Sequence, residues 1–191
     1  SYVFDINTPK GILKDFRFGL PGRHNLMNAL MAIAMAEIFG TPTEAIAVAL
    51  ASFKGVKRRF SYQIKTKNLV YIDDYAHHPT EIDAVHQAVR ELYPDKKVLA
   101  VFQPHLFSRT RDFADDFAKS LSNFDEVILM DIYPARELPI EGITSDWLLS
   151  KTTTDFFNFL CSFRFDVNEN RKITNPNIRN NLIFVQLNIL I

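Results

Sequence analysis

The sequence of 191 residues has little cysteine, little glycine and no long hydrophobic run. Its one cysteine, Cys161, excludes an internal disulfide framework and suits a reducing compartment. No apolar run approaches the roughly 18 residues that a membrane-spanning helix needs. The first residues also lack the basic-then-apolar pattern of a signal peptide. These absences predict a cytoplasmic protein without a membrane partner.

An excess of charge of either sign is also missing. Lys and Arg together number 22, as do Asp and Glu, so the formal net charge is zero. A surface that binds nucleic acid needs a basic excess, and we therefore expect no nucleic-acid partner. Hydrophobic residues make up 47% of the chain and charged residues 23%, which is typical of a globular protein that can bury a core.

Several catalytic motifs are absent from the sequence. No Cys/His set has zinc spacing, so we expect no metal held by protein ligands alone. There is no G-x-S-x-G elbow, no G-x-G-x-x-G and no G-x-x-x-x-G-K-[ST] phosphate loop. The chain therefore offers no recognisable means of cradling the β- and γ-phosphates of a nucleotide.

The first part of the chain predicts a hairpin followed by two helices. Residues 2–6 and 12–20 have strand character and flank the turn TPKG. Apolar periodicity predicts helices over residues 24–39 and 43–54, the first closed by Gly40. Both helices are unusually apolar, so we expect them to expose faces that another domain would cover.

Beyond this part, strands alternate with helices. Apolar runs predict strands at residues 68–74, 96–103 and 125–133, and the segments after them predict helices at residues 78–94, 108–124 and 144–151. The alternation predicts an α/β fold with a Rossmann-like, mostly parallel sheet and helices on both faces. In such sheets, ligands bind at the carboxyl ends of the strands.

The last part of the chain differs in composition. Residues 152–191 contain no glycine and are rich in asparagine. The final segment, LIFVQLNILI, has strong strand character and no charge. It either completes the sheet or belongs to a segment of different origin.

The segment DDYAHHPTEI follows the first of the alternating strands. Asp73 and Asp74 can accept from a ribose hydroxyl or hold a cation through water. His77 and His78 can donate to a carboxylate or phosphate and titrate near neutrality. The simpler interpretation is that Asp74 caps a turn and the histidines are solvated. Thr80 is expected to cap the following helix.

A second polar segment, QPHLFSRT, follows the next strand. Arg109 offers a planar fork that suits a carboxylate or phosphate, and His105 lies close to it in sequence. Ser108 or Thr110 is expected to cap the next helix. The alternative is an ordinary capped helix with an exposed arginine, but the two segments together favour a site that handles anions.

Two further clusters precede these segments. Lys57, Arg58 and Arg59 form a basic run that is either solvated or brings an arginine to a phosphate. Asn25 and Asn28 lie on one face of the first helix, where two amides can recognise a base edge, although capping by Asn25 is the simpler interpretation.

Five segments in order resemble the Mur ligases of peptidoglycan synthesis: LPGRHNLMNALMAIAMA, FKGVKRRF, DDYAHHPTEI, FQPHLFSRT and IYPARELPIEGITS. The resemblance runs from about residue 1 to residue 151. It implies a parent of three domains, which bind a UDP-sugar, ATP and an amino acid in turn. Residues 1–57 would be the C-terminal portion of the central ATP-binding domain. Residues 61–191 would be the C-terminal Rossmann-like domain, with an atypical tail at 152–191.

The resemblance also implies residue roles and substrates. The branch it favours joins L-alanine to UDP-N-acetylmuramate with ATP and Mg²⁺, through an acyl phosphate. The nucleotide would be bound by His24, Asn25, Asn28, Arg59 and Asp74. Alanine and the acyl phosphate would contact Tyr75, His77, His105 and Arg109. The catalytic residues would be Arg59, His77 and His105.

Two other functions remain open on the residues alone. One is a non-catalytic Rossmann-like module that binds a nucleotide or an anion. The other is a receiver-like regulator whose acidic pair holds Mg²⁺, although the expected late lysine is missing and Arg136 stands in that region. We expect this chain alone to be inactive and to self-associate through its apolar helices or its tail.

Overall fold

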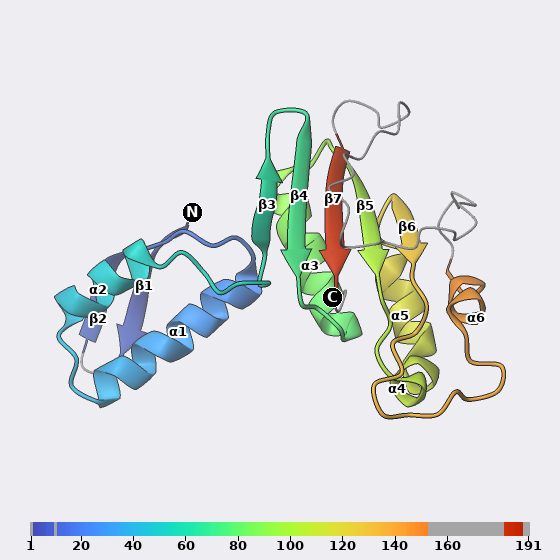
Figure 1. Ribbon diagram of the computed structural model, residues 1–191. Helices are drawn as coiled ribbons and strands as arrows, with labels where there is room; N and C mark the ends of the chain where they lie inside the picture. Colours follow the sequence, from blue (N-terminus) through green and yellow to red (C-terminus); the bar gives the residue numbers. More distant parts are fainter. Residues whose placement is uncertain (1, 10, 153–181, 189–191) are drawn as a thin grey trace. The chain divides into compact units, whose positions relative to one another are not determined.

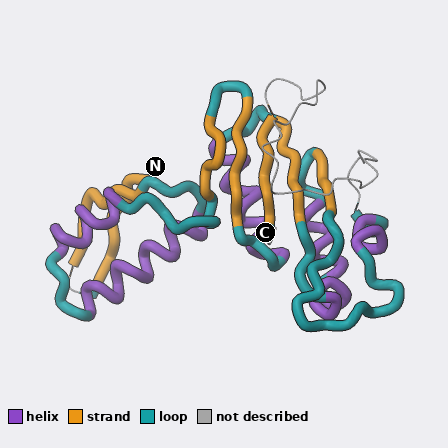
Figure 2. Tube along the Cα trace, in the orientation of Figure 1, coloured by secondary structure: helices purple, strands orange, loops and turns teal. Residues whose placement is uncertain are grey.

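The computed structural model describes residues 2–9, 11–152 and 182–188, so Cys161 and most of the tail lie outside the described residues. The chain divides into two compact units (Figures 1 and 2). The first comprises residues 1–57 and 87–94, and the second comprises residues 58–86 and 95–191. Among the described residues, no helix is long and apolar enough to cross a membrane.

The first unit contains the predicted hairpin and both predicted helices. Strands β1 (Tyr2–Thr8) and β2 (Gly11–Phe18) pair antiparallel. Helices α1 (Arg23–Ile38) and α2 (Thr43–Ser52) follow. The hairpin and helices share a core whose buried members are Ile6, Phe16, Phe18, Ala29, Ile33, Ile46 and Leu50. The sequence prediction for this part is confirmed to within two residues at most helix ends.

Glycine determines both ends of α1. Gly22 precedes the helix at a φ of 89°, and an added Cβ would lie 2.7 Å from Cε1 of His24, so a side chain there is excluded. At the other end, Gly40 has a φ of 78°. The N–H of Gly40 donates to Glu37 and that of Thr41 donates to Ala36, which is the Schellman pattern. The predicted stop at Gly40 is confirmed.

Helix α1 presents an apolar face that the core does not use. Met27, Met31 and Met35 are spaced four residues apart and are at least half exposed. Val48 on α2 is 69% exposed. The expected exposure of apolar faces on these helices is confirmed.

The second unit is built on a five-stranded sheet. Its strands are β3 (Ser61–Lys65), β4 (Leu69–Asp74), β5 (Lys97–Phe102), β6 (Glu126–Leu129) and β7 (Leu182–Leu187). The spatial order is β3-β4-β7-β5-β6, with β3 antiparallel to β4 and the other pairs parallel. The predicted class, a mostly parallel α/β sheet flanked by helices, is confirmed. Strand β3 was not predicted, and the predicted strand at 125–133 ends early, at Leu129.

Strand β7 lies at the centre of this sheet (Figure 2). It pairs in register with β4 on one side and β5 on the other, so Asp74, Leu187 and Phe102 lie side by side at the carboxyl ends. Of the two alternatives for the end of the chain, residues 182–187 therefore complete the sheet.

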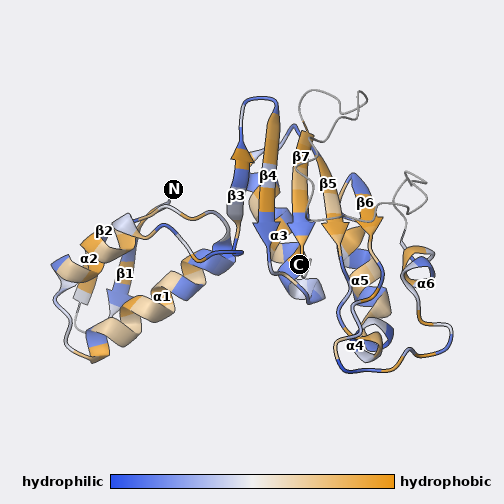
Figure 3. Ribbon diagram, viewed as in Figure 1, coloured by the Kyte–Doolittle hydropathy of each residue, from blue (hydrophilic) through white to orange (hydrophobic). Residues whose placement is uncertain are grey.

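One face of the sheet is almost wholly buried. Its side chains come from alternate positions of the three central strands: Val70, Ile72, Val98, Ala100, Phe102, Ile183, Val185 and Leu187. Helices α3 (Pro79–Leu92) and α5 (Ala114–Leu121) cover this face (Figure 1), and Phe117 of α5 packs on Phe102 at 5.5 Å between ring centres. Figure 3 shows the three central strands as largely hydrophobic.

The predicted helix at 108–124 is two helices. Helix α4 (Phe107–Asp112) is capped by Phe113, and α5 begins at the next residue, Ala114. The buried apolar residues of α5 are Ala114, Phe117, Ala118 and Leu121. The sequence period does not show this break because helical residues continue on both sides of it. The last predicted helix is shorter than expected, since α6 spans Ser145–Leu149, capped by the side chain of Thr144.

Candidate functional site

The carboxyl ends of β4, β7 and β5 place the two polar segments at one edge of the sheet. The segment DDYAHHP leaves β4 at Asp74, and QPHLFSRT leaves β5 after Phe102. Asn188, just after β7, links the two, because its N–H donates to the Asp74 carbonyl and its side chain donates to the Gln103 carbonyl. The two polar segments, which the sequence predicts at neighbouring strand ends, are therefore neighbours in the fold.

The Asp74 carboxylate has internal partners. Its Oδ1 accepts from the Ala76 N–H at 2.8 Å, and its Oδ2 accepts from the Phe60 N–H at 2.7 Å. The residue is only 3% exposed. Burial raises the pKa of this carboxyl, and the two N–H groups and Arg59 oppose that rise in part. The structure thus gives Asp74 the turn-capping role that was the simpler interpretation of the sequence.

These contacts hold a strained turn next to the site. Arg58 and Phe60 have φ values of 60° and 48°, in the left-handed region that costs energy for residues other than glycine. The Arg58 carbonyl accepts from the Tyr75 N–H at 2.8 Å. The guanidinium carbons of Arg58 and Arg59 lie 5.0 Å and 6.0 Å from the centre of the Tyr75 ring. The turn therefore delivers two cations to the face of one tyrosine.

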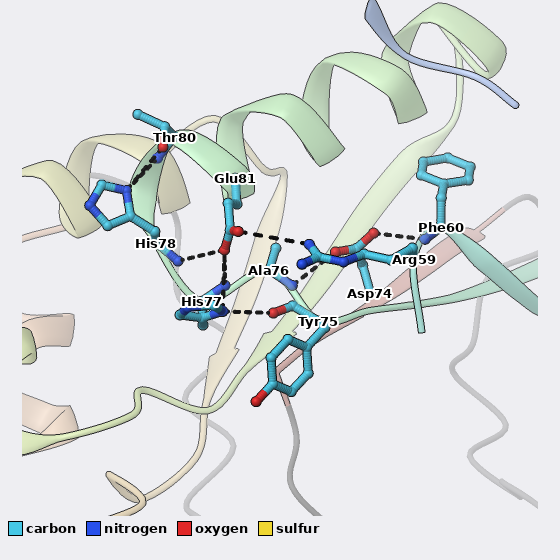
Figure 4. A network of polar contacts seen from close by, with 9 residues as sticks. All are labelled: Arg59, Phe60, Asp74, Tyr75, Ala76, His77, His78, Thr80 and Glu81. Carbon is cyan, nitrogen blue, oxygen red and sulfur yellow. Dashed lines mark hydrogen bonds and ion pairs between the residues drawn. The ribbon is translucent and has the colours of Figure 1, made fainter. Parts of the chain in front are cut away.

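Glu81 connects two of the three predicted catalytic residues, His77 and Arg59 (Figure 4). Its Oε2 accepts from the backbone N–H groups of His77, at 2.9 Å, and His78, at 3.2 Å, and it lies 3.3 Å from Nδ1 of His77. Its Oε1 lies 3.7 Å from Arg59. Partial burial alone would raise the pKa of Glu81, but the His77 N–H, the His77 ring and Arg59 outweigh burial, so this pKa is lowered.

The start of α3 differs from the prediction that Thr80 caps it. Helix α3 begins at Pro79, so Thr80 lies inside the first turn. Nδ1 of His78 lies 2.9 Å from the Thr80 hydroxyl, and Glu81 accepts from the His78 N–H. His78 therefore stands in the capping position, with Glu81 in the reciprocal place of a capping box. In Figure 4 the His78 ring points toward Thr80, and His77 lies on the side of Tyr75.

His105 is fixed by the loop after β6. Its ring stacks on Tyr133, with 5.5 Å between ring centres and 14° between planes. The Tyr133 N–H donates to Pro104, and its carbonyl accepts from Leu106. Burial lowers the pKa of His105, and the charges of Arg109 and His77 add to this effect. The charges of Arg109 and His77 therefore both act on His105.

The predicted cap of the helix after β5 is also different. Ser108 does not cap α4; instead its N–H and hydroxyl both donate to the Glu137 carboxylate, which comes from the loop after β6. These two hydrogen bonds lower the pKa of Glu137. Thr110 is buried, and its hydroxyl donates to the Leu106 carbonyl. Arg109 lies on α4 between them and is half-buried.

The family model of the Mur ligase glutamate ligase domain matches residues 58–157. The chain belongs to the Mur ligase family. The chain is 79% identical over 153 residues to the UDP-N-acetylmuramate–L-alanine ligase of Flavobacterium johnsoniae and 77% identical over 150 residues to that of Flavobacterium psychrophilum. These matches cover 80% and 78% of this chain and 34% of each relative.

A solved structure agrees with the sequence matches. The UDP-N-acetylmuramate–alanine ligase of Thermotoga maritima superposes with a TM-score of 0.66 at 26% identity, over 92% of this chain and 36% of that one. The chain thus spans about a third of the length of the Mur ligases that it matches. Its resemblance to the family, inferred from five segments, is confirmed.

Three of the residues predicted to bind the nucleotide, His24, Asn25 and Asn28, lie in the first unit. His24 packs over Gly22, and Asn28 is exposed on α1. The Asn25 side chain does not cap the helix start but donates from Nδ2 to the Pro21 carbonyl at 2.7 Å. Their role toward a nucleotide stays a prediction.

Sequence reasoning missed three residues that shape the candidate site. Glu81 was not singled out, although the spacing H-x-x-x-E places it four residues from His77. Tyr133 and Glu137 lie in the segment IYPARELP, which carried the resemblance but gave no chemical signal. Only the fold shows that this segment supports His105 and Ser108.

Proposed function

We propose that this chain is part of an ATP-dependent ligase that joins L-alanine to UDP-N-acetylmuramate through an acyl phosphate. The observation that carries the proposal is that the segments after β4 and β5, which contain His77, His105 and Arg109, lie at one edge of the sheet and are linked by Asn188. The names of the relatives at 79% and 77% identity support the substrates.

The geometry suits an amino acid. Arg109 offers a forked cation for the alanine carboxylate. The two histidines supply proton acceptors for the amine, which must lose a proton before it attacks. The lowered pKa of His105 keeps that imidazole neutral at physiological pH. Tyr75, with Arg58 and Arg59 over its ring, borders His77 and would face the acyl phosphate.

The described residues offer a phosphate partner for the nucleotide but no ligand set for Mg²⁺. Arg59 is an available phosphate partner, since its side chain is half exposed and its ion pair with Glu81 is long, at 3.7 Å. Among the described residues, no group of three or more His, Cys, Asp or Glu is placed to hold a metal. Both oxygens of Asp74 accept N–H groups, so this part of the chain does not fit Mg²⁺. We assign Mg²⁺ to the nucleotide and to the rest of the ligase.

The domain boundaries belong to the same proposal. Residues 1–57 are the C-terminal portion of the central ATP-binding domain, and residues 61–191 are the C-terminal domain, with an atypical tail at 152–191. The proposal also includes a cytoplasmic setting, where ATP and UDP-N-acetylmuramate both occur. The receiver-like alternative is disfavoured, because Asp73 is paired with Arg58 at 3.6 Å and each oxygen of Asp74 accepts a backbone N–H group.

ADP release tests the proposal. In the complete polypeptide, release should require ATP, UDP-N-acetylmuramate and L-alanine together. This chain alone should release none, because its sequence has no phosphate loop. Alanine-dependent ADP release by this chain alone would contradict the proposal that the phosphate loop, which this sequence does not contain, is needed for activity. Nucleotide binding without turnover in the complete polypeptide would favour the non-catalytic module instead.

A further inference from the structure

We infer that Glu81 is a positioning residue that fixes the tautomer of His77, so that Nε2 of His77 is the atom that takes the proton from the incoming amine. The inference rests on the proposed function for its substrate. It rests on the contacts around Nδ1 for its geometry, and those contacts can be measured without turnover.

The surroundings of Nδ1 determine where the proton of a neutral His77 lies. The Tyr75 carbonyl is 3.0 Å from Nδ1, and Oε2 of Glu81 is 3.3 Å from it. A carbonyl oxygen carries no proton, and the lowered pKa of Glu81 keeps its carboxylate ionised. Both neighbours can only accept, so Nδ1 must donate. The lone pair of the neutral ring then lies on Nε2.

Glu81 is itself held rigidly enough to act in this way. The N–H groups of His77 and His78 donate to the same oxygen that faces Nδ1, which fixes the carboxylate at the start of α3. Its other oxygen faces Arg59. The Glu81 side chain therefore contacts both His77, the proposed base, and Arg59, the proposed phosphate partner. Other groups that face His77 are the Tyr75 ring, 5.4 Å away, and His105, whose charge interacts with it.

The proton transfer balances without any further reactant. One N–H bond of the alanine ammonium breaks, and a new N–H bond forms at Nε2 of His77. The amine keeps the electron pair of the broken bond and uses it to attack the acyl phosphate. The imidazolium that results lies against the Glu81 carboxylate, which stabilises its charge.

The first test is the tautomer itself, read from imidazole ¹⁵N chemical shifts in this chain, with the His77 signals assigned from a His77→Gln variant. The wild-type ring should be protonated on Nδ1. In Glu81→Gln, the amide oxygen can still accept the capping N–H groups, but the charge is gone, and the share of the Nδ1-protonated form should fall. A wild-type ring protonated on Nε2, or an unchanged tautomer in Glu81→Gln, would overturn the inference.

The second test is kinetic and uses the complete polypeptide. Glu81→Gln should lower kcat/KM for alanine roughly 10- to 100-fold, by analogy with the loss of the carboxylate partner of a metal-ligating histidine. It should also move the acidic limb of the pH profile to lower pH, because the imidazolium loses its neighbouring negative charge. Asp83→Asn is the matched control, since it removes one charge from the same helix, where Asp83 only accepts from Asn123.

The outcomes separate the inference from the proposed function. A lower plateau with an unmoved acidic limb, or an equal change in Asp83→Asn, would show that Glu81 only caps the helix and would overturn the inference. If the wild-type polypeptide shows no alanine-dependent ADP release, the proposed function fails. The ¹⁵N measurement then decides the role of Glu81 by itself.

Discussion

Asp74 accepts a hydrogen bond of 2.7 Å from the N–H of Phe60, and this contact joins the end of β4 to the strained turn that carries Arg59. The same carboxylate accepts from Ala76. Two buried donors therefore depend on one side chain. Their loss would free the turn and displace both arginines from the Tyr75 ring.

The first prediction concerns the two hydrogen bonds that the Asp74 carboxylate accepts. Asp74→Ala leaves the N–H groups of Phe60 and Ala76 without a partner, at a cost of about 1–3 kcal/mol for each buried donor. Hydrogen exchange of these two amides should accelerate far more than exchange within β5. Unchanged protection of the Phe60 amide would show that Asp74 does not hold the turn.

The pH dependence of stability has a definite sign at this residue. Burial raises the pKa of Asp74 above its ordinary 3.8, so the folded chain holds this proton more tightly than the unfolded chain. The contribution of Asp74 to stability therefore falls as pH rises from 3.8 through the raised pKa. Urea unfolding at several pH values should show this slope in the wild type and lose it in Asp74→Ala.

The second prediction concerns His105. Burial, Arg109 and His77 lower the pKa of His105 below 6.5, so the folded state disfavours its protonated form, and stability is lost as pH falls below 6.5. Arg109→Ala should move the NMR titration midpoint of His105 upward. Arg111→Ala is the control, because Arg111 pairs with Asp112. An equal shift in both variants would mean that the Arg109 charge does not reach His105.

The third prediction concerns the exposed apolar side chains of α1 and α2. Met31 and Val48 are 63% and 69% exposed, and exposed apolar side chains that cluster promote association. We expect this chain to self-associate at micromolar concentration and Met31→Gln with Val48→Gln to reduce the association in light scattering. Leu138→Gln, at a residue that is 85% exposed elsewhere, should have no effect. A wild-type monomer would contradict the prediction.

The central strands could be predicted because the positions that are buried in the fold carry apolar side chains in the sequence. Val70, Ile72, Val98 and Ala100 are apolar in sequence and almost fully buried in the fold. Strand β3 was missed, since SYQIK alternates polar and apolar residues over only five positions, which is a weak signal, and it is largely exposed at the edge of the sheet. The central place of β7 was also beyond reach, because a sequence pattern gives strand character and not strand order.

The site was predictable as far as residue types at strand ends allow. His77, His105 and Arg109 were found because polar residues after buried strands stand out. Glu81 was not found, because a carboxylate at a helix start has the same appearance in sequence whether it caps the helix or also orients a neighbour. Only its distance to His77 separates the two roles. Glu137 was not found, because it lies in the loop after β6 and meets Ser108 only through the fold.

The measurement that tests the central claim most directly is the alanine dependence of the complete ligase carrying Arg109→Ala. Loss of a forked, charged partner of the alanine carboxylate should lower kcat/KM for alanine on the order of 10- to 100-fold, since charged hydrogen bonds contribute roughly 1.5–3 kcal/mol. Arg111→Ala, two positions along the same helix and 51% exposed, should leave it unchanged. If Arg109→Ala keeps the wild-type kcat/KM, the amino acid does not bind at the carboxyl ends of β4 and β5, and the proposed site is wrong.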